Sequence, residues 1–525
     1  MRRLHPRSAV LRVGRAAVQG AVFGFFVGTA LAGSLGLPAW VGPALAPLGA
    51  TVTGGFALVR YYRFRYEIVD ETLAVESGVL ARQSREIPLG RIQNVDLRQG
   101  VLNRLLGLTI VDFETAGGST TEASLDAVAP EEADRLRRLV QQFDRESRDR
   151  AAGTVDSSAD ETDSEASSES AADDEVTDLF AFSWRDLLTY AVVSVRPAAP
   201  VLTLAGLPLG GDLVAAIVRF NLTLVGAEPA LTPSVLEPFG PPRLVALALL
   251  TLVEFLLAAL VVSVVLTVVE YYDFRLFREG DDLRYQRGLV RRYSGTIPLS
   301  KVQTVTVKEN VLMRRFGLAT LVVETAGYGG GTQQSEQGVA VPMAPREEVY
   351  ELARDIEPFG TFEFERPPTR ARRRYAFRFA VVAAVLNGVG YAVDTFLLES
   401  GDWWVLLGLF VLVPLAAHLR WRHRGFALDD DVLATRAGFW SQTTRIVPYY
   451  RVQTVFVGRS PFQRRRDLAT VTADTASTAS VLGGSATAYD VDEETATDLR
   501  TELRKRLYTD LLARKRARRM DESGR

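Results

Sequence analysis

Few residues in this chain have the types and spacing that catalysis requires. Cysteine is absent, and the only histidines are His5, His418 and His423, which share no metal-ligand spacing. Disulfides, thiolate metal sites and cysteine nucleophiles are therefore excluded. No Ser-His-Asp set and no catalytic pair of carboxylates can be assembled with any specificity. We predict that the protein is not an enzyme and has no catalytic residue, no cofactor and no metal site.

A glycine run is the only feature that resembles a phosphate-binding loop. Gly327, Gly329, Gly330 and Gly331 match such a loop in glycine content, but no Gly-Lys-Ser/Thr follows. We interpret the run as a hairpin tip.

One carboxylate stands inside a strongly apolar segment. Glu254 lies about 15 Å from the outer end of Leu244–Val269 at the helical rise of 1.5 Å per residue. A charge near the bilayer midplane is costly and marks a functional candidate. Arg196 reaches a similar depth if the preceding span starts near Leu187, so we predict an intramembrane pair, Arg196 and Glu254, that holds two helices together. A proton or ion pathway and a protonated or lumen-facing Glu254 are the alternatives.

Apolar segments of about 20 residues, the length that crosses a bilayer, surround this helix. The chain has one pair near its start, the span containing Glu254, and one pair further on: Ala17–Leu35, Ala39–Val59, Leu244–Val269, Ala376–Leu398 and Trp403–Leu419. The stretch from Trp184 to Val225 is apolar but interrupted by Arg, Pro and Asp. We predict that it crosses as the first arm of a second hairpin; an interfacial helix that does not cross is the alternative.

Arginines flank the apolar pairs, and the hairpin tips carry neither Lys nor Arg. Because basic residues favour the cytoplasmic side, we predict a multi-pass cell-membrane protein with both termini and all segments between the hairpins in the cytoplasm.

A threefold repeat organises the chain. Ile87–Val95 recurs without a gap as Ile297–Val305 and again as Val447–Val455, each with Pro at the second position and Gln at the seventh. Glu114-Thr115-Ala116 returns as Glu324-Thr325-Ala326 and Asp474-Thr475-Ala476 in the same alignment. Each unit alternates apolar residues at strand spacing and then opens a helix with acidic residues, as at Pro130-Glu131-Glu132. The plan is an α+β barrel-like domain hung from each hairpin.

These motifs resemble the bacterial pleckstrin-homology-like (PH-like) family of membrane-flanked domains. The resemblance covers Tyr61–Glu146, Tyr271–Glu357 and Trp421–Arg506 and implies multi-pass α-helical membrane hairpins that carry three α+β PH-like barrels. It implies for each barrel seven bent strands and a C-terminal helix. The third copy departs from the pattern, because Arg466-Asp467 replaces Phe316-Gly317.

The domain boundaries follow from the repeat. We predict a basic flank and hairpin 1, PH-like domain 1, an acidic disordered linker, hairpin 2, PH-like domain 2, a basic flank and hairpin 3, PH-like domain 3 and a basic tail, at residues 1–60, 61–148, 149–178, 179–270, 271–359, 360–420, 421–508 and 509–525. The linker is predicted from its Ser, Asp and Glu content.

Two repeated polar features are candidate contact sites. The first is an edge formed by the repeated Pro and Gln: Pro88, Gln93, Pro298, Gln303, Pro448 and Gln453. The structural alternative is a strand entrance whose Gln satisfies a backbone group. The second is a basic, lipid-facing loop with Arg104, Arg314, Arg315, Arg464, Arg465 and Arg466. Each such charge gains about 1 kcal/mol from anionic lipid; a solvated loop is the alternative.

Composition adds expectations about partners and habitat. The net charge is −2, and we expect no nucleic-acid partner. Scarce lysine and abundant acidic residues indicate a high-salt proteome, as in a halophilic archaeon; a high-GC genome is the alternative. The sequence predicts a non-enzymatic membrane scaffold that contacts the bilayer. Its further partner is either anionic lipid headgroups or a cytoplasmic or membrane protein, and the sequence leaves open whether the protein forms a homo-oligomer. A component of a transport or export system is the alternative.

Overall fold

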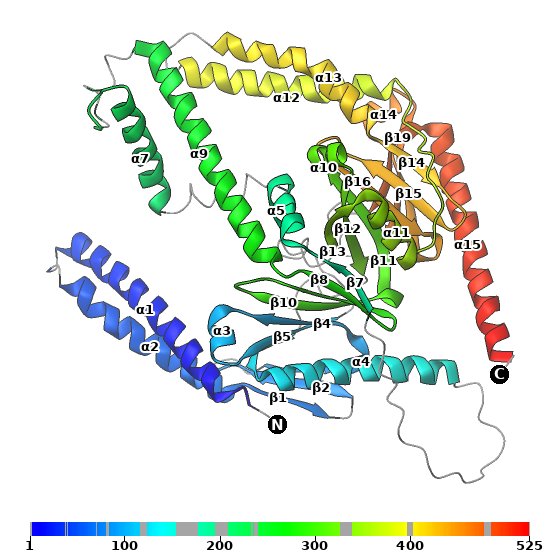
Figure 1. Ribbon diagram of the computed structural model, residues 1–525, viewed down its shortest axis with the longest axis horizontal. Coiled ribbons are helices and arrows are strands. Elements are labelled where there is room, and N and C mark those ends of the chain that lie inside the picture. Colours follow the sequence, from blue (N-terminus) through cyan, green and yellow to red (C-terminus); the bar gives the residue numbers. More distant parts are fainter. Residues whose placement is uncertain are drawn as a thin grey trace.

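The computed structural model describes most of the chain. The described residues are 3–36, 38, 40–69, 71–79, 83–115, 123–153, 177–194, 208–230, 232, 235, 240–325, 339–395, 403–476 and 485–523. Within them, apolar helices, six antiparallel strands and a closing helix recur three times along the chain (Figure 1).

The first repeat begins with a tight helical hairpin. Its elements are α1 Pro6–Leu35, α2 Val41–Arg63, β1 Arg65–Val69, β2 Thr72–Ser77, β3 Gln83–Pro88, η1 Leu89–Arg91, β4 Ile92–Gln99, α3 Val101–Leu105, β5 Thr109–Thr115, β6 Ala123–Val128 and α4 Pro130–Gly153. Glycines let α1 and α2 touch: a Cβ at Gly20 or at Gly49 would collide with the backbone carbonyl of the other. Small residues at helix contacts are typical of membrane pairs, where backbones approach closely.

The second repeat has a broken first arm. Its elements are β7 Thr177–Ala181, α5 Trp184–Val193, α7 Pro208–Leu224, α9 Gly240–Tyr271, β8 Arg275–Glu279, β9 Asp282–Arg287, β10 Arg292–Pro298, η3 Leu299–Lys301, β11 Val302–Asn310, α10 Val311–Phe316, β12 Leu318–Thr325, β13 Val339–Pro345 and α11 Arg346–Ile356. Residues 195–207, between α5 and α7, lie outside the described residues, and so does Arg196. Both α5 and α7 contact α9.

The third repeat follows the same order. Its elements are α12 Ala371–Val393, η6 Trp403–Gly408, α13 Leu409–Arg422, β14 Gly425–Leu428, β15 Val432–Ala437, β16 Ser441–Pro448, η7 Tyr449–Arg451, β17 Val452–Gly458, α14 Pro461–Arg464, β18 Leu468–Thr475, β19 Ala486–Asp492 and α15 Glu493–Ser523. In the part of the chain that the structure describes, five helices are long and apolar enough to span a membrane: Pro6–Leu35, Val41–Arg63, Ala246–Tyr271, Ala371–Ala392 and Trp403–Arg422. The predicted sixth crossing is not a continuous helix within the described residues.

Strand pairing joins the repeats. Each repeat has a first trio of strands and a second trio, and the second trio of one repeat pairs with the first trio of the next. Strand β4 pairs with β10, and β11 pairs with β16, both antiparallel. The core is continuous across the second junction, since Val432 and Ile446 of the third repeat belong to the same buried cluster as Val305 and Val307 of the second. The 7-stranded and the 6-stranded sheet are therefore each shared by two consecutive domains (Figure 1).

Several expected boundaries change in the structure. The expected acidic linker lies largely outside the described residues, but Thr177 and Asp178 at its end belong to β7, which pairs with β8. The reason is local apolar content, since the ring centroid of Phe182 lies 5.7 Å from that of Phe274. Helix α4 continues to Gly153, and α15 continues through the expected tail to Ser523. The predicted count of seven strands is not confirmed, because the described part of each repeat has six and β7 adds one only to the second.

Candidate functional site

A short helix follows the fourth strand of every repeat. Helices α3, α10 and α14 occupy this place, and all six arginines of the predicted basic loop lie on or just after them. The residue that closes each turn has a left-handed backbone, with φ of 64° at Gly107, 66° at Gly317 and 49° at Asp467. Asp is among the few non-glycine residues that tolerate this region. The substitution noticed in the third copy therefore preserves the turn.

The same position of each short helix exposes a large apolar side chain. Leu102, Leu312 and Phe462 are repeat equivalents and are 54 %, 49 % and 52 % exposed. Leu105 and Phe316 add exposed apolar area on α3 and α10. A soluble surface rarely repeats an exposed apolar residue beside arginines, whereas such a mixture is typical of helices that lie in a membrane interface.

Each short helix lies beside the hairpin of its own repeat. Arg7 Nη1, at the start of α1, donates to Leu106 O at 3.1 Å. Asn310 Nδ2 donates to Val193 O, the end of α5, at 2.7 Å. The ring centroid of Phe462 lies 6.0 Å from that of Phe377 on α12. The exposed apolar residues are thus placed where the membrane helices meet the domains.

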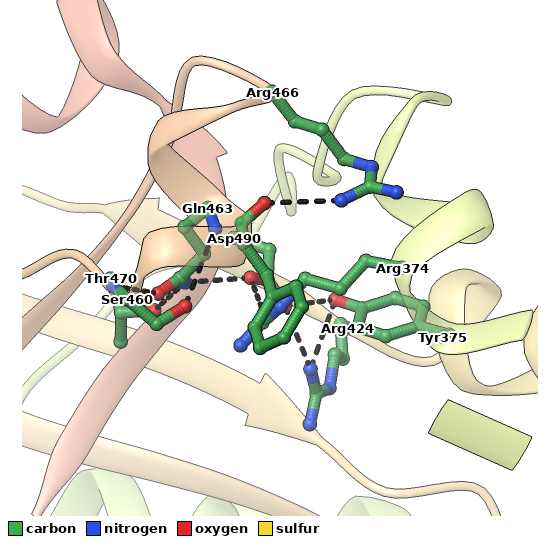
Figure 2. Close-up of polar contacts among 9 residues, drawn as sticks. Arg374, Tyr375, Arg424, Ser460, Gln463, Arg466, Thr470 and Asp490 are labelled. Atoms are coloured by element: carbon green, nitrogen blue, oxygen red, sulfur yellow. Dashed lines mark hydrogen bonds and ion pairs between the residues drawn. The ribbon is translucent and has the colours of Figure 1, made fainter. Parts of the chain in front are cut away.

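The six predicted arginines do not all face solvent. Arg104, Arg315, Arg464 and Arg465 are exposed. Arg314 is half-buried, and its Nη2 donates to Phe439 O of the third repeat at 2.5 Å. Arg466 Nη1 donates to Phe462 O at 3.2 Å (Figure 2). The exposed four are available to a lipid surface, while Arg314 contributes to the junction between the second and third domains.

A second apolar turn lies at the same boundary. Between the second and third strands of the second repeat, Leu289 N donates to Val269 O of α9 at 2.9 Å. Val290 in this turn is 44 % exposed, and its equivalent Trp440 is 77 % exposed. Sequence analysis missed these turns and Leu102, Leu312 and Phe462, although the gapless repeat alignment contains them.

The repeated Pro and Gln residues lie at a strand bend. Pro88, Pro298 and Pro448 end β3, β10 and β16. Each Gln is the second residue of the next strand, where the register shifts by a β-bulge. Gln303 is buried, and its Nε2 donates to Lys301 O at 3.3 Å, whereas Gln453 is exposed. A buried Gln at a bulge favours the structural interpretation in the second repeat.

Glu254 has a partner on the neighbouring helix. Asn221 Nδ2 of α7 donates to Glu254 Oε2 at 2.6 Å and lies 3.3 Å from Thr251 Oγ1. The predicted pair with Arg196 stays a prediction, because Arg196 is outside the described residues. The hydrogen bond from Asn221 to Glu254 therefore links α7 to α9.

The third repeat contains a buried polar cluster that sequence analysis did not find (Figure 2). Asp490 of β19 is fully buried, and its Oδ2 accepts hydrogen bonds from Tyr375 OH at 2.7 Å and Arg424 Nη1 at 3.3 Å. Its Oδ1 accepts from Arg374 Nη1 and from Gln463 Nε2, the latter at 2.8 Å. The cluster ties α12 and the exit of α13 to the domain.

The repeat alignment carried a signal for this cluster. Phe64 and Phe274 are matched by Arg424, and Met313 is matched by Gln463. Arg424 is a charged residue at a position that is apolar in both other repeats, whereas the position of Gln463 is Asn103 in the first repeat. A charged residue at a position that is otherwise apolar indicates a partner nearby, because a buried charge is costly unless it is paired. Both oxygens of the Asp490 carboxylate accept hydrogen bonds, whereas Arg424 Nε has no hydrogen-bond partner among the described residues. We interpret the cluster as a structural connection.

Burial changes the titration of two groups near the domain junctions. Burial raises the pKa of Glu309 on β11, while Arg346, Arg436 and Arg314 oppose the shift. Burial also raises the pKa of Tyr449 to about 12, against the effect of Arg506. Among the described residues, no group of three or more His, Asp and Glu could hold a metal ion.

Comparison with known proteins decides the family. The model of the bacterial PH domain matches residues 21–144, 222–359 and 378–507, which is most of the chain and all three repeats. The chain belongs to the bacterial PH domain family. It is a three-copy membrane protein of that family, as the repeat and its helices predicted. No solved structure matches it.

Two relatives of this bacterial PH domain protein come from Bacillus subtilis (strain 168). UPF0699 transmembrane protein YdbT is 25% identical over 451 residues, covering 84% of this chain and 85% of YdbT. UPF0699 transmembrane protein YdbS is 34% identical over 113 residues, covering 21% of this chain and 69% of YdbS. The long relative therefore parallels nearly the whole chain, and the short one parallels about one repeat.

Proposed function

We propose that this protein is a non-enzymatic membrane scaffold that holds three bacterial PH domains against anionic lipid headgroups at the cytoplasmic face. The observation that carries the proposal is the recurrence of an exposed apolar residue, at Leu102, Leu312 and Phe462, on a short helix with exposed arginines beside a membrane hairpin. Apolar side chains enter the headgroup region, and arginines meet anionic lipid around them.

Strand pairing supports a shared side of the membrane. Strands cannot pair through a bilayer, and β4 pairs with β10 while β11 pairs with β16. Helix α9 alone would take the chain across once, between the first and second domains. The segment with α5 and α7 must then cross in the opposite direction, which restores the six-span, three-hairpin arrangement. The arginines that flank the hairpins favour the cytoplasmic side.

The test places a fluorophore at the proposed contact. Because the chain has no cysteine, Leu102→Cys, Leu312→Cys and Phe462→Cys each give one labelling site for an environment-sensitive dye. In bilayer discs with anionic lipid we expect, at all three sites, dye emission characteristic of apolar surroundings and quenching by quenchers attached to lipids. The matched control is Val69→Cys, a 49 % exposed apolar site at the far end of β1. Emission equal to that of the control at all three sites would contradict the proposal.

A second measurement tests the contribution of the exposed arginines to lipid binding. Neutralising Arg104, Arg315, Arg464 and Arg465 to Gln should reduce the dependence of that emission on anionic lipid, by about 1 kcal/mol per charge at low salt. The effect should shrink in high salt, because screening shortens the reach of each charge. Unchanged lipid dependence in the fourfold variant would remove headgroup binding from the proposal.

A transport or export role is the second candidate, favoured by the Asn221–Glu254 contact inside the helices. Under this function, Glu254→Gln would abolish transport and leave the amount of folded protein unchanged. If the variant loses only stability, the contact serves helix packing.

A further inference from the structure

Both junctions between domains use one register. At the first junction Gln99, Arg98 and Leu97 face Arg292, Tyr293 and Ser294. Their repeat equivalents Glu309, Lys308 and Val307 face Gln442, Thr443 and Thr444 at the second junction. Two independent junctions with the same residue-for-residue pairing define a module: the fourth strand of one repeat receives the third strand of the next.

Two members of this module remain at the outer edges of the sheets. Strand β17, the fourth strand of the last repeat, is terminal in the sheet β17-β18-β19. Strand β3, the third strand of the first repeat, is terminal in β1-β2-β3. Within the described residues, no other strand pairs with the outer edge of β17 or of β3.

The strands that pair between repeats and their equivalents at the outer edges differ in side-chain exposure. Val307 and Thr306 on β11 are fully buried, while their equivalents Val457 and Phe456 on β17 are 37 % and 56 % exposed. The first four residues of β3 are exposed, whereas the C-terminal halves of its equivalents β10 and β16 are mostly buried. The outer strands carry the surface that the inner ones bury.

Strand β17 also lacks the features that protect an edge. Its sequence from Val452 to Gly458 has no charged residue and no proline. Natural proteins place charges, prolines or covering segments on exposed edges because an open edge recruits another strand. An uncharged edge with exposed Phe456 and Val457 is suited to a strand partner.

We propose that β17 of one copy of this chain receives β3 of a second copy, in the register of the two internal junctions. In that register Val457 faces Ser84 of the second copy, as Val307 faces Thr444 and Leu97 faces Ser294. Phe456 then faces Arg85, and Val455 faces Glu86. Because the contact is head-to-tail, it joins copies into rings or rows within the plane of the membrane.

Cysteine cross-linking tests this pairing directly. One tagged chain carries Ser84→Cys and a second, differently tagged chain carries Val457→Cys, both otherwise free of cysteine. Directly opposed residues of antiparallel strands lie about 4.5–5.5 Å apart, within the range of a disulfide. We expect a disulfide-linked dimer that contains both tags when the two chains are expressed together and mildly oxidised in the membrane.

Internal and register controls make the result decisive. Leu97→Cys with Ser294→Cys is the equivalent pair at the first junction and should form a link within one chain. Glu67→Cys on β1, at the opposite edge of the same sheet as β3, should not link to Val457→Cys. A third control adds Phe456→Asp to the Val457→Cys chain, which should lower the linked fraction severalfold.

Three outcomes would overturn the proposal. The first is no linked dimer while the Leu97 and Ser294 pair links normally. The second is a dimer of Val457→Cys chains with each other, which would indicate pairing of β17 with itself. The third is a link between Ser84→Cys and Val457→Cys that forms only when both are in one chain, which would indicate closure within a single copy.

Discussion

The second and third repeats fill the same space between hairpin and domain with opposite chemistry. In the second repeat Phe274, Met313 and Met343 are buried in an apolar cluster. In the third repeat the equivalent residues are Arg424, Gln463 and Asp490, which hydrogen-bond to one another. The last equivalence follows from strand register, because Ala319 pairs with Ala344 and Ala469 pairs with Val491.

The difference shows that the backbone of the repeat does not require one kind of core. An apolar core gains from burial and tolerates partial loss, whereas a buried charge network is stable only when every member is present. Arg424 and Arg374 both depend on Asp490. The polar version therefore makes attachment of the third hairpin to its domain sensitive to a single carboxylate.

Removing that carboxylate should have the largest effect. Asp490→Ala leaves Arg424 and Arg374 without their shared partner, and breaking one side of a buried ion pair costs about 3–5 kcal/mol. Ala itself fits the left-handed backbone, because the equivalent residue Ala127 has φ of 74°. Hydrogen exchange of the full chain in detergent should show faster exchange across β19. Unchanged protection of β19 would contradict the role given to the cluster.

Truncation of the equivalent residue in the apolar core of the second repeat is the matched comparison. Met343→Ala removes a buried side chain from β13, and the loss is expected to be about 2–5 kcal/mol from transfer and cavity terms. Exchange across β13 should accelerate less than exchange across β19 does in Asp490→Ala. An equal or larger effect would show that the charge network is no more fragile than the apolar core.

Transplanting the apolar set should restore part of the lost stability. The triple variant Arg424→Phe, Gln463→Met and Asp490→Met gives the third repeat the residues of the second. Replacing a buried ion pair by well-packed apolar residues is often neutral or stabilising. Met at position 490 must, however, adopt the left-handed backbone of Asp490, with φ of 57°, which Met343 does not have. Arg374 lies near the domain and keeps a route to solvent, since its side chain is 14 % exposed. Exchange of β19 in the triple variant should be slower than in Asp490→Ala; the reverse order would sink the comparison.

A smaller effect is expected from a buried carboxylate that has weaker partners. Arg346 Nε lies 3.6 Å from Glu309 Oε1, and within the described residues this oxygen accepts no hydrogen bond. Burial raises the pKa of Glu309, so the folded state binds its proton more tightly than the unfolded state does. Folding stability from this group therefore falls as pH rises from the unfolded pKa through the raised folded pKa.

Glu309→Gln should remove that slope. The midpoint of thermal unfolding of the variant should rise relative to the original protein as the pH increases from the unfolded pKa of Glu309 through its raised folded pKa, and the difference should persist at higher pH. Parallel curves for the two proteins would show that Glu309 does not titrate differently on folding.

The sequence predicted the repeat, its helices and its strands because these depend on local patterns. Ile297–Val305 and its copies align without gaps, and apolar length alone identifies the five continuous spans. The pairing of β4 with β10 and of β11 with β16 could not be predicted, since a strand's alternation does not identify which distant strand lies beside it.

The candidate site was predicted in part for a similar reason. Arg104 and Arg315 were identified in the sequence by their charge, and both are exposed; that they face lipid stays a prediction. Leu102 and Phe462 are functional candidates because the structure shows that they are exposed. The sequence alone does not distinguish an exposed apolar residue from a buried one, so it did not identify them. Arg314 was grouped with the lipid-facing arginines, but its contact with Phe439 depends on the junction between domains.

The most direct measurement for the whole account is the side of the membrane on which each domain lies. Ser77→Cys, Ser294→Cys and Ser441→Cys place one thiol in each domain of a chain without cysteine. With a membrane-impermeant thiol reagent, all three should label only after the cells are opened, because three domains joined by strand pairing share one side of the membrane, which we propose is the cytoplasmic side. Labelling of Ser294→Cys on intact cells, with Ser77→Cys shielded, would contradict the account.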